Sequence, residues 1–474
     1  MIEVGLGLSL PDGAVSRREV AACVGAVWLP LWSGTAVTVP RRSHDDYVKA
    51  ASAALREHGS SGIGGSLTMA RLSEALGVSR STLYRWWNTT ADAAIDVVVH
   101  SATSPDSWDE RFLDQPPSGG VGAGLAAALV DRTADLSVTS RCAVAGWAPD
   151  SPGRAWVARH ERRWIARCAS WLAAGQPTEI DVCWTDVAIV LRAMVEGMLF
   201  LRLASNPDFS APWSRADAVA AGDAADALVV ELTSALRGVD RPMEGADAPL
   251  AAAPRYTRGQ REALERLNRT VDGTPAAHHL LTPNRLVDLD RLARQLGVSP
   301  RRLYMVWPTV ADLNGDLVVE LIRDNRALVE KVSLQALGTV LEGKFERVRD
   351  LLPSVFAVML DSTASATAAF FAATIAMVEA PVRYRAAEVV AEWTSAQRVL
   401  FLAMLQAIGD HLKPVTDPDA YVFAVFGALA GSHRLALLHP ELVQRTVWFH
   451  EEEHPCLPAG ITAACRSFTE SCEH

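Results

Sequence analysis

The sequence predicts an all-α fold made of two tandem units, and three observations support this. A stretch running from Thr68 to Trp87 returns as the stretch from Asp288 to Trp307, with Leu292 standing 220 positions after Leu72, which indicates duplication of a whole unit. Elsewhere the apolar residues recur at helical spacing, and no strand-like alternation stands out. Finally, 474 residues exceed the usual domain of about 100–200 residues, so two units of this size fit the length.

The first copy of the repeated stretch predicts two short helices that meet at a glycine. From Met69 to Leu76, apolar residues at i, i+3 and i+7 give one buried helix face. Gly77 suits the left-handed residue that ends a helix, and Ser79 suits the N-cap of the next one. Leu83 and Trp87, four apart, form the buried edge of the second helix. Helix, glycine turn and helix, with polar residues facing outward, is typical of a DNA-reading helix-turn-helix.

The second copy keeps the buried positions and changes the outward ones. Ser299 and Pro300 form an N-cap followed by a first-turn proline, and Tyr304 repeats the tyrosine of the first copy. Although the whole chain has a net charge of −10, three arginines face one glutamate in the first copy and four face two aspartates in the second. Each motif is therefore locally positive on an acidic chain, which is compatible with binding nucleic acid.

Both copies, together with a preceding helix, resemble the DNA-binding domain of tetracycline-repressor-type (TetR family) regulators. The resemblance includes a following Trp-x-x-x-Ala-Asp element, which starts at Trp87 in the first copy and at Trp307 in the second. It implies a ligand-responsive transcriptional regulator, a repressor, acting on a double-stranded DNA operator in the bacterial cytoplasm and associated with the nucleoid. The chain departs from many members of the family because it has no lysine near the start of the fourth helix of either unit.

The resemblance and the composition together predict the domain organisation. A loop is expected at residues 104–120, a first helix at residues 41–58, and the first helix of the second unit from Tyr256 onward. The expected divisions are an N-terminal extension at residues 1–40, a first helix-turn-helix domain at 41–103, a first helical ligand-binding and dimerisation domain at 104–237, a linker at 238–255, a second helix-turn-helix domain at 256–325 and a second helical domain at 326–474.

The predicted DNA contacts lie on the outward faces of the two motifs. Arginine suits guanine because its fork meets two acceptors, whereas tyrosine suits phosphate. Since the two faces differ, we expect an asymmetric operator. The two bodies would pair inside one chain as a pseudo-dimer, or two chains would form a homodimer. The candidate DNA-binding residues are Thr68, Ser79, Arg80, Ser81, Thr82, Tyr84 and Arg85 in the first motif and Ser299, Arg301, Arg302 and Tyr304 in the second.

Aromatic residues and a methionine in the helical bodies are candidates for an effector pocket. Such walls suit a small apolar or aromatic ligand, although aromatic residues at helical spacing also pack in cores. The segment from Tyr421 to Leu438 is rich in small residues and suits close helix packing, at a dimer-like interface or in a core. The candidate ligand-binding residues are Trp147, Trp164, Trp171, Trp184, Met198, Phe356, Trp393 and Phe401.

Other classes of function find little support in the sequence. Seven scattered cysteines form no CxxC pair, and the His/Cys group from His450 to His474 matches no zinc spacing, so we expect a solvated tail there, no metal and no cofactor. Gly25, Pro30 and Gly34 interrupt the apolar stretch before residue 40, which disfavours a membrane span. No catalytic constellation is present, so we expect no enzyme. The alternative function is a sensor or protein-interaction module in which one or both motifs no longer bind DNA.

Overall fold

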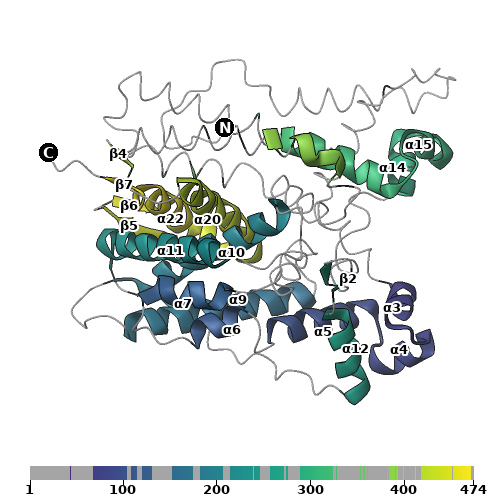
Figure 1. Ribbon diagram of the computed structural model, residues 1–474, viewed down its shortest axis with the longest axis horizontal. Helices are drawn as coiled ribbons and strands as arrows, with labels where there is room; N and C mark the ends of the chain where they lie inside the picture. Colours follow the sequence, from purple (N-terminus) through teal and green to yellow (C-terminus); the bar gives the residue numbers. More distant parts are fainter. Residues whose placement is uncertain are drawn as a thin grey trace. The chain divides into compact units, whose positions relative to one another are not determined.

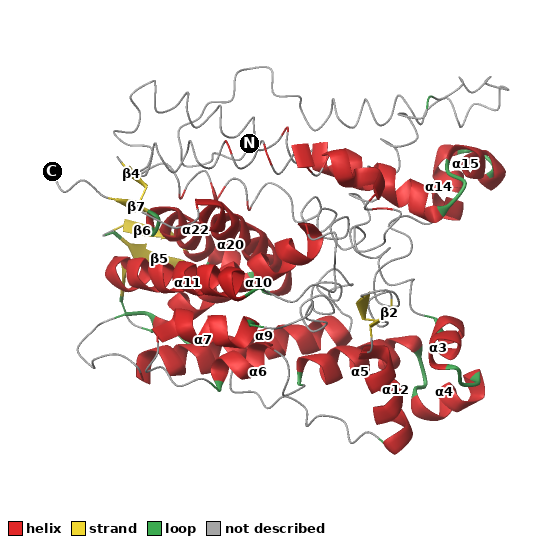
Figure 2. Cartoon of the chain, in the orientation of Figure 1, coloured by secondary structure: helices red, strands yellow, loops and turns green. Residues whose placement is uncertain are grey.

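The structure, a computed structural model, covers most of the elements that the sequence predicts. It describes residues 43, 68–103, 108–114, 120–130, 152–174, 182–205, 214–238, 240–245, 257–268, 270–271, 274–275, 289–323, 411–412, 418–450 and 452–470, with single positions and short stretches between 327 and 399. These residues are mostly helical (Figures 1 and 2), which confirms the all-α character. The expectations for residues 1–40, for the helix at 41–58 and for Trp147, Trp393 and Phe401 lie outside the described residues.

The helices that the structure describes in the first half of the chain fall between Met69 and Ala235. They are α3 (Met69–Leu76), α4 (Arg80–Trp86), α5 (Thr90–Ala102), α6 (Trp108–Leu113), α7 (Gly120–Leu129), α9 (Pro152–Ala174), α10 (Trp184–Ser205) and α11 (Arg215–Ala235). Those in the second half are α12 (Arg258–Asn268), α14 (Leu289–Leu296), α15 (Pro300–Val306), α20 (Pro418–Leu438), α21 (Glu441–Gln444) and α22 (Cys456–Arg466), and residues 310–323 are also helical.

Short antiparallel strands join parts of the chain that are far apart in sequence. Strand β1 (Leu236–Arg237) directly follows α11 and pairs with β5 (Thr446–Phe449), which pairs in turn with β6 (Glu452–Pro455). The remaining strands form two-stranded pairs, β2 (Thr270–Val271) with β3 (Thr274–Pro275) and β4 (His411–Leu412) with β7 (Thr469–Glu470). The β1–β5 pairing therefore ties the end of the first half to the second half.

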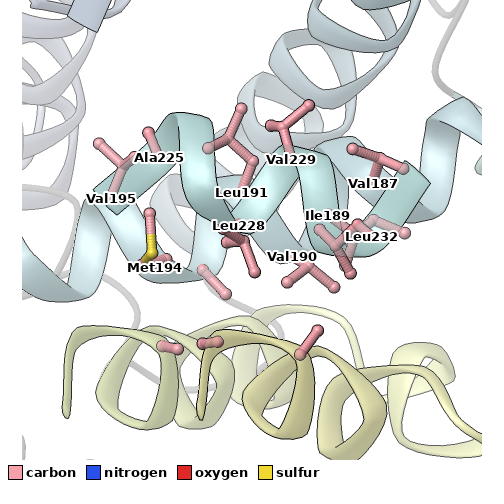
Figure 3. Packing of buried hydrophobic residues seen from close by; sticks show 14 of the residues in the cluster. Val187, Ile189, Val190, Leu191, Met194, Val195, Ala225, Leu228, Val229 and Leu232 are labelled. Atoms are coloured by element: carbon pink, nitrogen blue, oxygen red, sulfur yellow. The ribbon is translucent and has the colours of Figure 1, made fainter. Parts of the chain in front are cut away.

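The tightest packing between the two halves joins α10 to α20 through glycines. A methyl group added to Gly197 would overlap the carbonyl oxygen of Gly427, and one added to Gly431 would overlap the carbonyl oxygen of Ala193. Backbones can approach this closely only where no Cβ intervenes. Helices α11 and α22 also contact this pair, and Figure 3 shows apolar side chains of α10 and α11, such as Leu228, packed above the C-terminal helices. The predicted close helix packing of the segment from Tyr421 to Leu438 is confirmed.

A buried network of charged side chains crosses the same contact. Arg192 on α10 donates to Asp109 at 2.9 Å and to Glu161 at 2.6 Å, and it pairs with Glu196 at 2.8 Å. Arg434 on α20 pairs with Glu161 and, at 3.4 Å, with Glu196. Burial disfavours the charge of Arg192, but the three carboxylates outweigh this and raise its pKa above the usual arginine value. Removing one partner from such a network costs about 3–5 kcal/mol, because a buried charge is left uncompensated.

Two local predictions were wrong, and both were overridden by tertiary contacts. Residues 104–120 were expected to form a loop, but they contain helix α6, whose Asp109 holds Arg192 and whose Phe112 stacks on Trp164 with ring centroids 5.8 Å apart. The expected solvated tail contains helix α22, which is buried from Cys456 to Cys465. Within the described ranges, no group of three or more His, Cys, Asp or Glu residues could hold a metal ion.

None of the helices in the described part of the chain combines the length and the apolar character needed to cross a bilayer.

Replacing Gly431 by alanine tests the backbone contact between α10 and α20. We expect Gly431→Ala to lower the free energy of unfolding by about 1–3 kcal/mol or more, because the new methyl group meets a backbone carbonyl that cannot rotate away. Thermal or urea unfolding followed by circular dichroism measures the change. Ala123→Ser adds one heavy atom on the exposed face of α7 and is the control, with a far smaller effect expected. Equal stability of Gly431→Ala and the wild type would contradict the contact.

Candidate nucleic-acid interface

Helices α3 and α4 meet at the predicted glycine turn. Thr68 caps α3, its hydroxyl accepting a hydrogen bond from the Arg71 amide at 3.2 Å. Gly77 has a φ of 65°, and its amide donates to the carbonyl of Glu74 at 3.2 Å. This left-handed residue closes the last turn of α3, and the chain reverses into α4. Its glycine requirement is conformational, since no atom lies within 4 Å of an added Cβ.

The second copy repeats the backbone hydrogen bonds of this turn. Gly297 has a φ of 63°, and its amide donates to the carbonyl of Arg294 at 3.3 Å. The following valine amide, Val298, donates to Ala293 at 3.0 Å, just as Val78 donates to Ser73 at 3.2 Å in the first copy. The sequence repeat therefore encodes the same helix, glycine turn and helix twice.

Helices α4 and α15 are each also fixed to the helix that follows. The indole Nε1 of Trp87 donates to Asp96 at 2.6 Å, and that of Trp307 donates to Asp316 at 2.8 Å, again with an offset of 220 residues. Burial raises the pKa of Asp96, and the hydrogen bond from Trp87 opposes the rise. Thr89 caps α5 in a reciprocal capping box, in which its hydroxyl accepts from the Asp92 amide and its own amide donates to the Asp92 carboxylate. A movement of α5 would thus be passed to α4.

The predicted DNA-contacting residues lie largely on the outer face of α4 and α15. Arg80, Ser81, Tyr84 and Arg85 are exposed, as are Arg301 and Tyr304, whereas Thr82 and Arg302 are half-buried. The buried edges are Leu83 with Trp87 and Leu303 with Trp307. Thr68 and Ser79 cap α3 and α4, and the Ser79 hydroxyl accepts a hydrogen bond from the Thr82 amide at 3.2 Å. The Ser299 side chain makes no such cap on α15.

The outward arginines of both helices are available to a ligand. Arg80 and Arg85 form no ion pair with any residue that the structure describes, and the same holds for Arg301 and Arg302. Guanidinium groups without a protein partner can donate to phosphate or to guanine. The two faces differ at one further position, because Met305, which is 79% exposed, stands where the first copy has Arg85.

Helix α12 packs on the first helix-turn-helix, although its sequence position suggests that it begins the second unit. Ala263 and Leu264 are buried in one apolar cluster with Leu72, Trp87 and other residues of α3, α4 and α5. Its Gln260 side chain donates to the carbonyl oxygen of Trp86 at 3.3 Å. The local amphipathic pattern predicts the buried face of this helix but not which copy that face contacts.

Most candidate ligand residues that the structure describes pack in the apolar core. Trp171, Trp184, Met198 and Phe356 belong to the core cluster or pack against it. Trp164 is the one that also lines a cavity, of about 120 Å³, at the junction of α5, α6 and α9. The other residues that line this cavity are polar or charged, namely Thr103, Glu110, His160, Arg163 and Arg167.

The polar residues of this cavity and of the network behind it were missed in the sequence. A signal was present, because residues 187–201 of α10 are otherwise apolar or glycine and yet include Arg192 and Glu196 at i and i+4. In addition, α9 carries a run of charged residues from Arg159 to Arg163 inside a predicted body helix. Charged side chains within an apolar helix are expensive to bury unless they are paired, so such residues mark a buried network.

Comparisons with known proteins identify no family for this chain. No family model matches the chain, and no curated protein sequence matches it.

Truncating Leu264 tests whether α12 belongs to the first helix-turn-helix. We expect Leu264→Ala to destabilise α3 and α4 by about 2–5 kcal/mol, since it leaves a cavity in their shared cluster. Hydrogen exchange resolved along the chain should show faster exchange of the amides in α3 and α4. Arg261→Ala, on the exposed side of the same helix, is the control. Faster exchange in α14 and α15, with α3 and α4 unchanged, would place α12 on the second copy instead.

Proposed function

We propose that the chain is a ligand-responsive DNA-binding transcriptional regulator that carries two helix-turn-helix heads and acts as an intramolecular pseudo-dimer, as a repressor in the bacterial cytoplasm. Here the first head is α3 and α4, and the second head is α14 and α15. The observation that carries the proposal is the recurrence of the turn geometry, with arginines left outside both times. The resemblance to TetR-type regulators is consistent with this proposal.

The outward face of each reading helix suits double-stranded DNA. A helix of this kind enters the major groove, where an arginine fork can meet two acceptors of one guanine. Tyr84 and Tyr304 are positioned to donate to phosphates beside it. Because Met305 replaces Arg85 in the second head, that head offers an apolar contact where the first offers a cation. The operator is therefore asymmetric in this proposal.

Packing within the chain supports the pseudo-dimer. The α10–α20 contact, the Arg434 pairing with Glu161 and the β1–β5 strand pair all join the first half to the second. Two heads tethered in this way meet their half-sites without a prior encounter between chains, so the second head binds at a high effective concentration. Affinity for the operator should then be independent of any association between separate proteins.

Removing the arginines of each head separately tests DNA binding. We expect Arg80→Ala/Arg85→Ala and Arg301→Ala/Arg302→Ala each to weaken binding, by about 1–3 kcal/mol for each base that an arginine no longer reaches. Removal of each phosphate-binding arginine should also lower the slope of log affinity against log salt by about 0.9. Gel shifts at several salt concentrations, on fragments selected from the parent genome, measure both effects. Arg215→Ala, which removes an exposed arginine of α11, is the matched control.

The outcome for each head is informative by itself. A pair whose removal leaves both affinity and salt slope unchanged belongs to a head that does not bind DNA, which would favour the sensor or protein-interaction function for that head. The exposed Met305 makes the second head the one to examine first. If neither pair matters, DNA binding by these faces is refuted.

A further inference from the structure

The cavity at the junction of α5, α6 and α9 lies where the first head joins the body. Thr103 is the C-cap of α5, and its hydroxyl donates to the carbonyl of Val99 at 2.7 Å. Glu110 comes from α6, and the remaining lining residues come from α9. A molecule held here would touch both the body and Thr103, at the C-terminal end of α5. The same helix holds the Trp87 indole through its Asp96 carboxylate.

Among the described residues that line the cavity, Arg163 is a cation without a partner. Arg167 pairs with Glu110, at 3.0 Å and 3.2 Å to the two carboxylate oxygens. The Nε2 of His160 lies 3.1 Å from Asp109, so the ring is already engaged with a carboxylate. Arg163 makes no ion pair or side-chain hydrogen bond with any residue in the described part of the chain. The cavity therefore has an excess of positive charge and a guanidinium fork, which suits a carboxylate.

The volume of the cavity and the ring contacts of Trp164 restrict the rest of the ligand. The volume of about 120 Å³ is somewhat less than that of an engineered apolar cavity of about 150 Å³ that holds benzene. The indole ring of Trp164 already stacks on Phe112 and lies 4.4 Å from the Arg192 guanidinium, so it forms a wall. A compact acid with a short apolar part fits these surroundings, whereas the sequence suggests a small apolar or aromatic effector.

From these features, we infer that the cavity binds a small organic carboxylate, and that its occupancy is transmitted to the first head through α5. The carboxylate pairs with Arg163 and competes with Glu110 for Arg167. This loosens α6 from α9 at the point where α5 packs on α9 through Val99, Ala102 and Trp156. The transmission to the first head rests on the proposed function, whereas carboxylate binding itself does not.

Binding is tested on the full chain with propionate and butyrate as probes. Propionamide and butyramide have matched shapes without the charge, and all four are compared at constant ionic strength. We expect the two acids to raise the melting temperature, because a ligand that binds only the native state stabilises that state. We expect the two amides to leave the melting temperature unchanged. Isothermal titration should show Arg163→Ala weakening binding about tenfold or more, as expected for loss of one charge-assisted pair. Arg215→Ala should bind as the wild type does.

Several results would overturn the inference. They are the absence of binding by both acids, equal stabilisation by acids and amides, undiminished binding by Arg163→Ala, or an equal loss in Arg215→Ala. A separate gel shift with added butyrate tests the transmission. We expect it to reduce DNA affinity in the wild type but not in Arg163→Ala. If the acids bind and the chain binds no DNA, the cavity assignment stands and the proposed function fails, so the two are distinguishable.

Discussion

The backbone contact between α10 and α20 is the constraint on which the rest of the structure depends. Gly197, Gly427 and Gly431 remove the side chains that would keep these helices apart, so main-chain atoms of the two halves touch. Once the helices are this close, the buried charges of Arg192 and Arg434 can share carboxylates across the contact. Apolar burial alone would allow the helices to slide along each other, whereas shared ion pairs in a low dielectric favour one register.

The first head is joined to the remainder of the chain at two places. Helix α5 carries it on one side and packs on α9, where Val98 and Trp156 share an apolar cluster. On the other side, α12 reaches it from beyond the linker and buries Leu264 in its core. Met243, which lies within the expected linker, is buried in the body core. A head held in this way would respond to movements of both halves of the chain, which suits a regulator whose two heads act together.

The sequence allowed the local features to be predicted and left the long-range ones open. Gly77 and Gly297 have a conformational requirement that any similar turn would share, so their role could be read from spacing alone. In contrast, the partners of Arg192 come from residues 109, 161 and 196, and no local pattern connects them. Likewise, the buried face of α12 was predictable, but no local pattern indicates that this face packs on α3, α4 and α5. The cavity follows from the same distant pairings, and it was therefore not predictable.

The stoichiometry of the complex with DNA tests the pseudo-dimer most directly. Native mass spectrometry of the full chain with a selected genomic fragment counts chains per duplex, and footprinting on the same fragment locates the contacts. The account predicts one chain on one duplex, protecting two unlike half-sites about one helical turn, or 34–36 Å, apart. Two chains on every occupied duplex, with no one-chain complex at any protein concentration and identical half-sites, would contradict it.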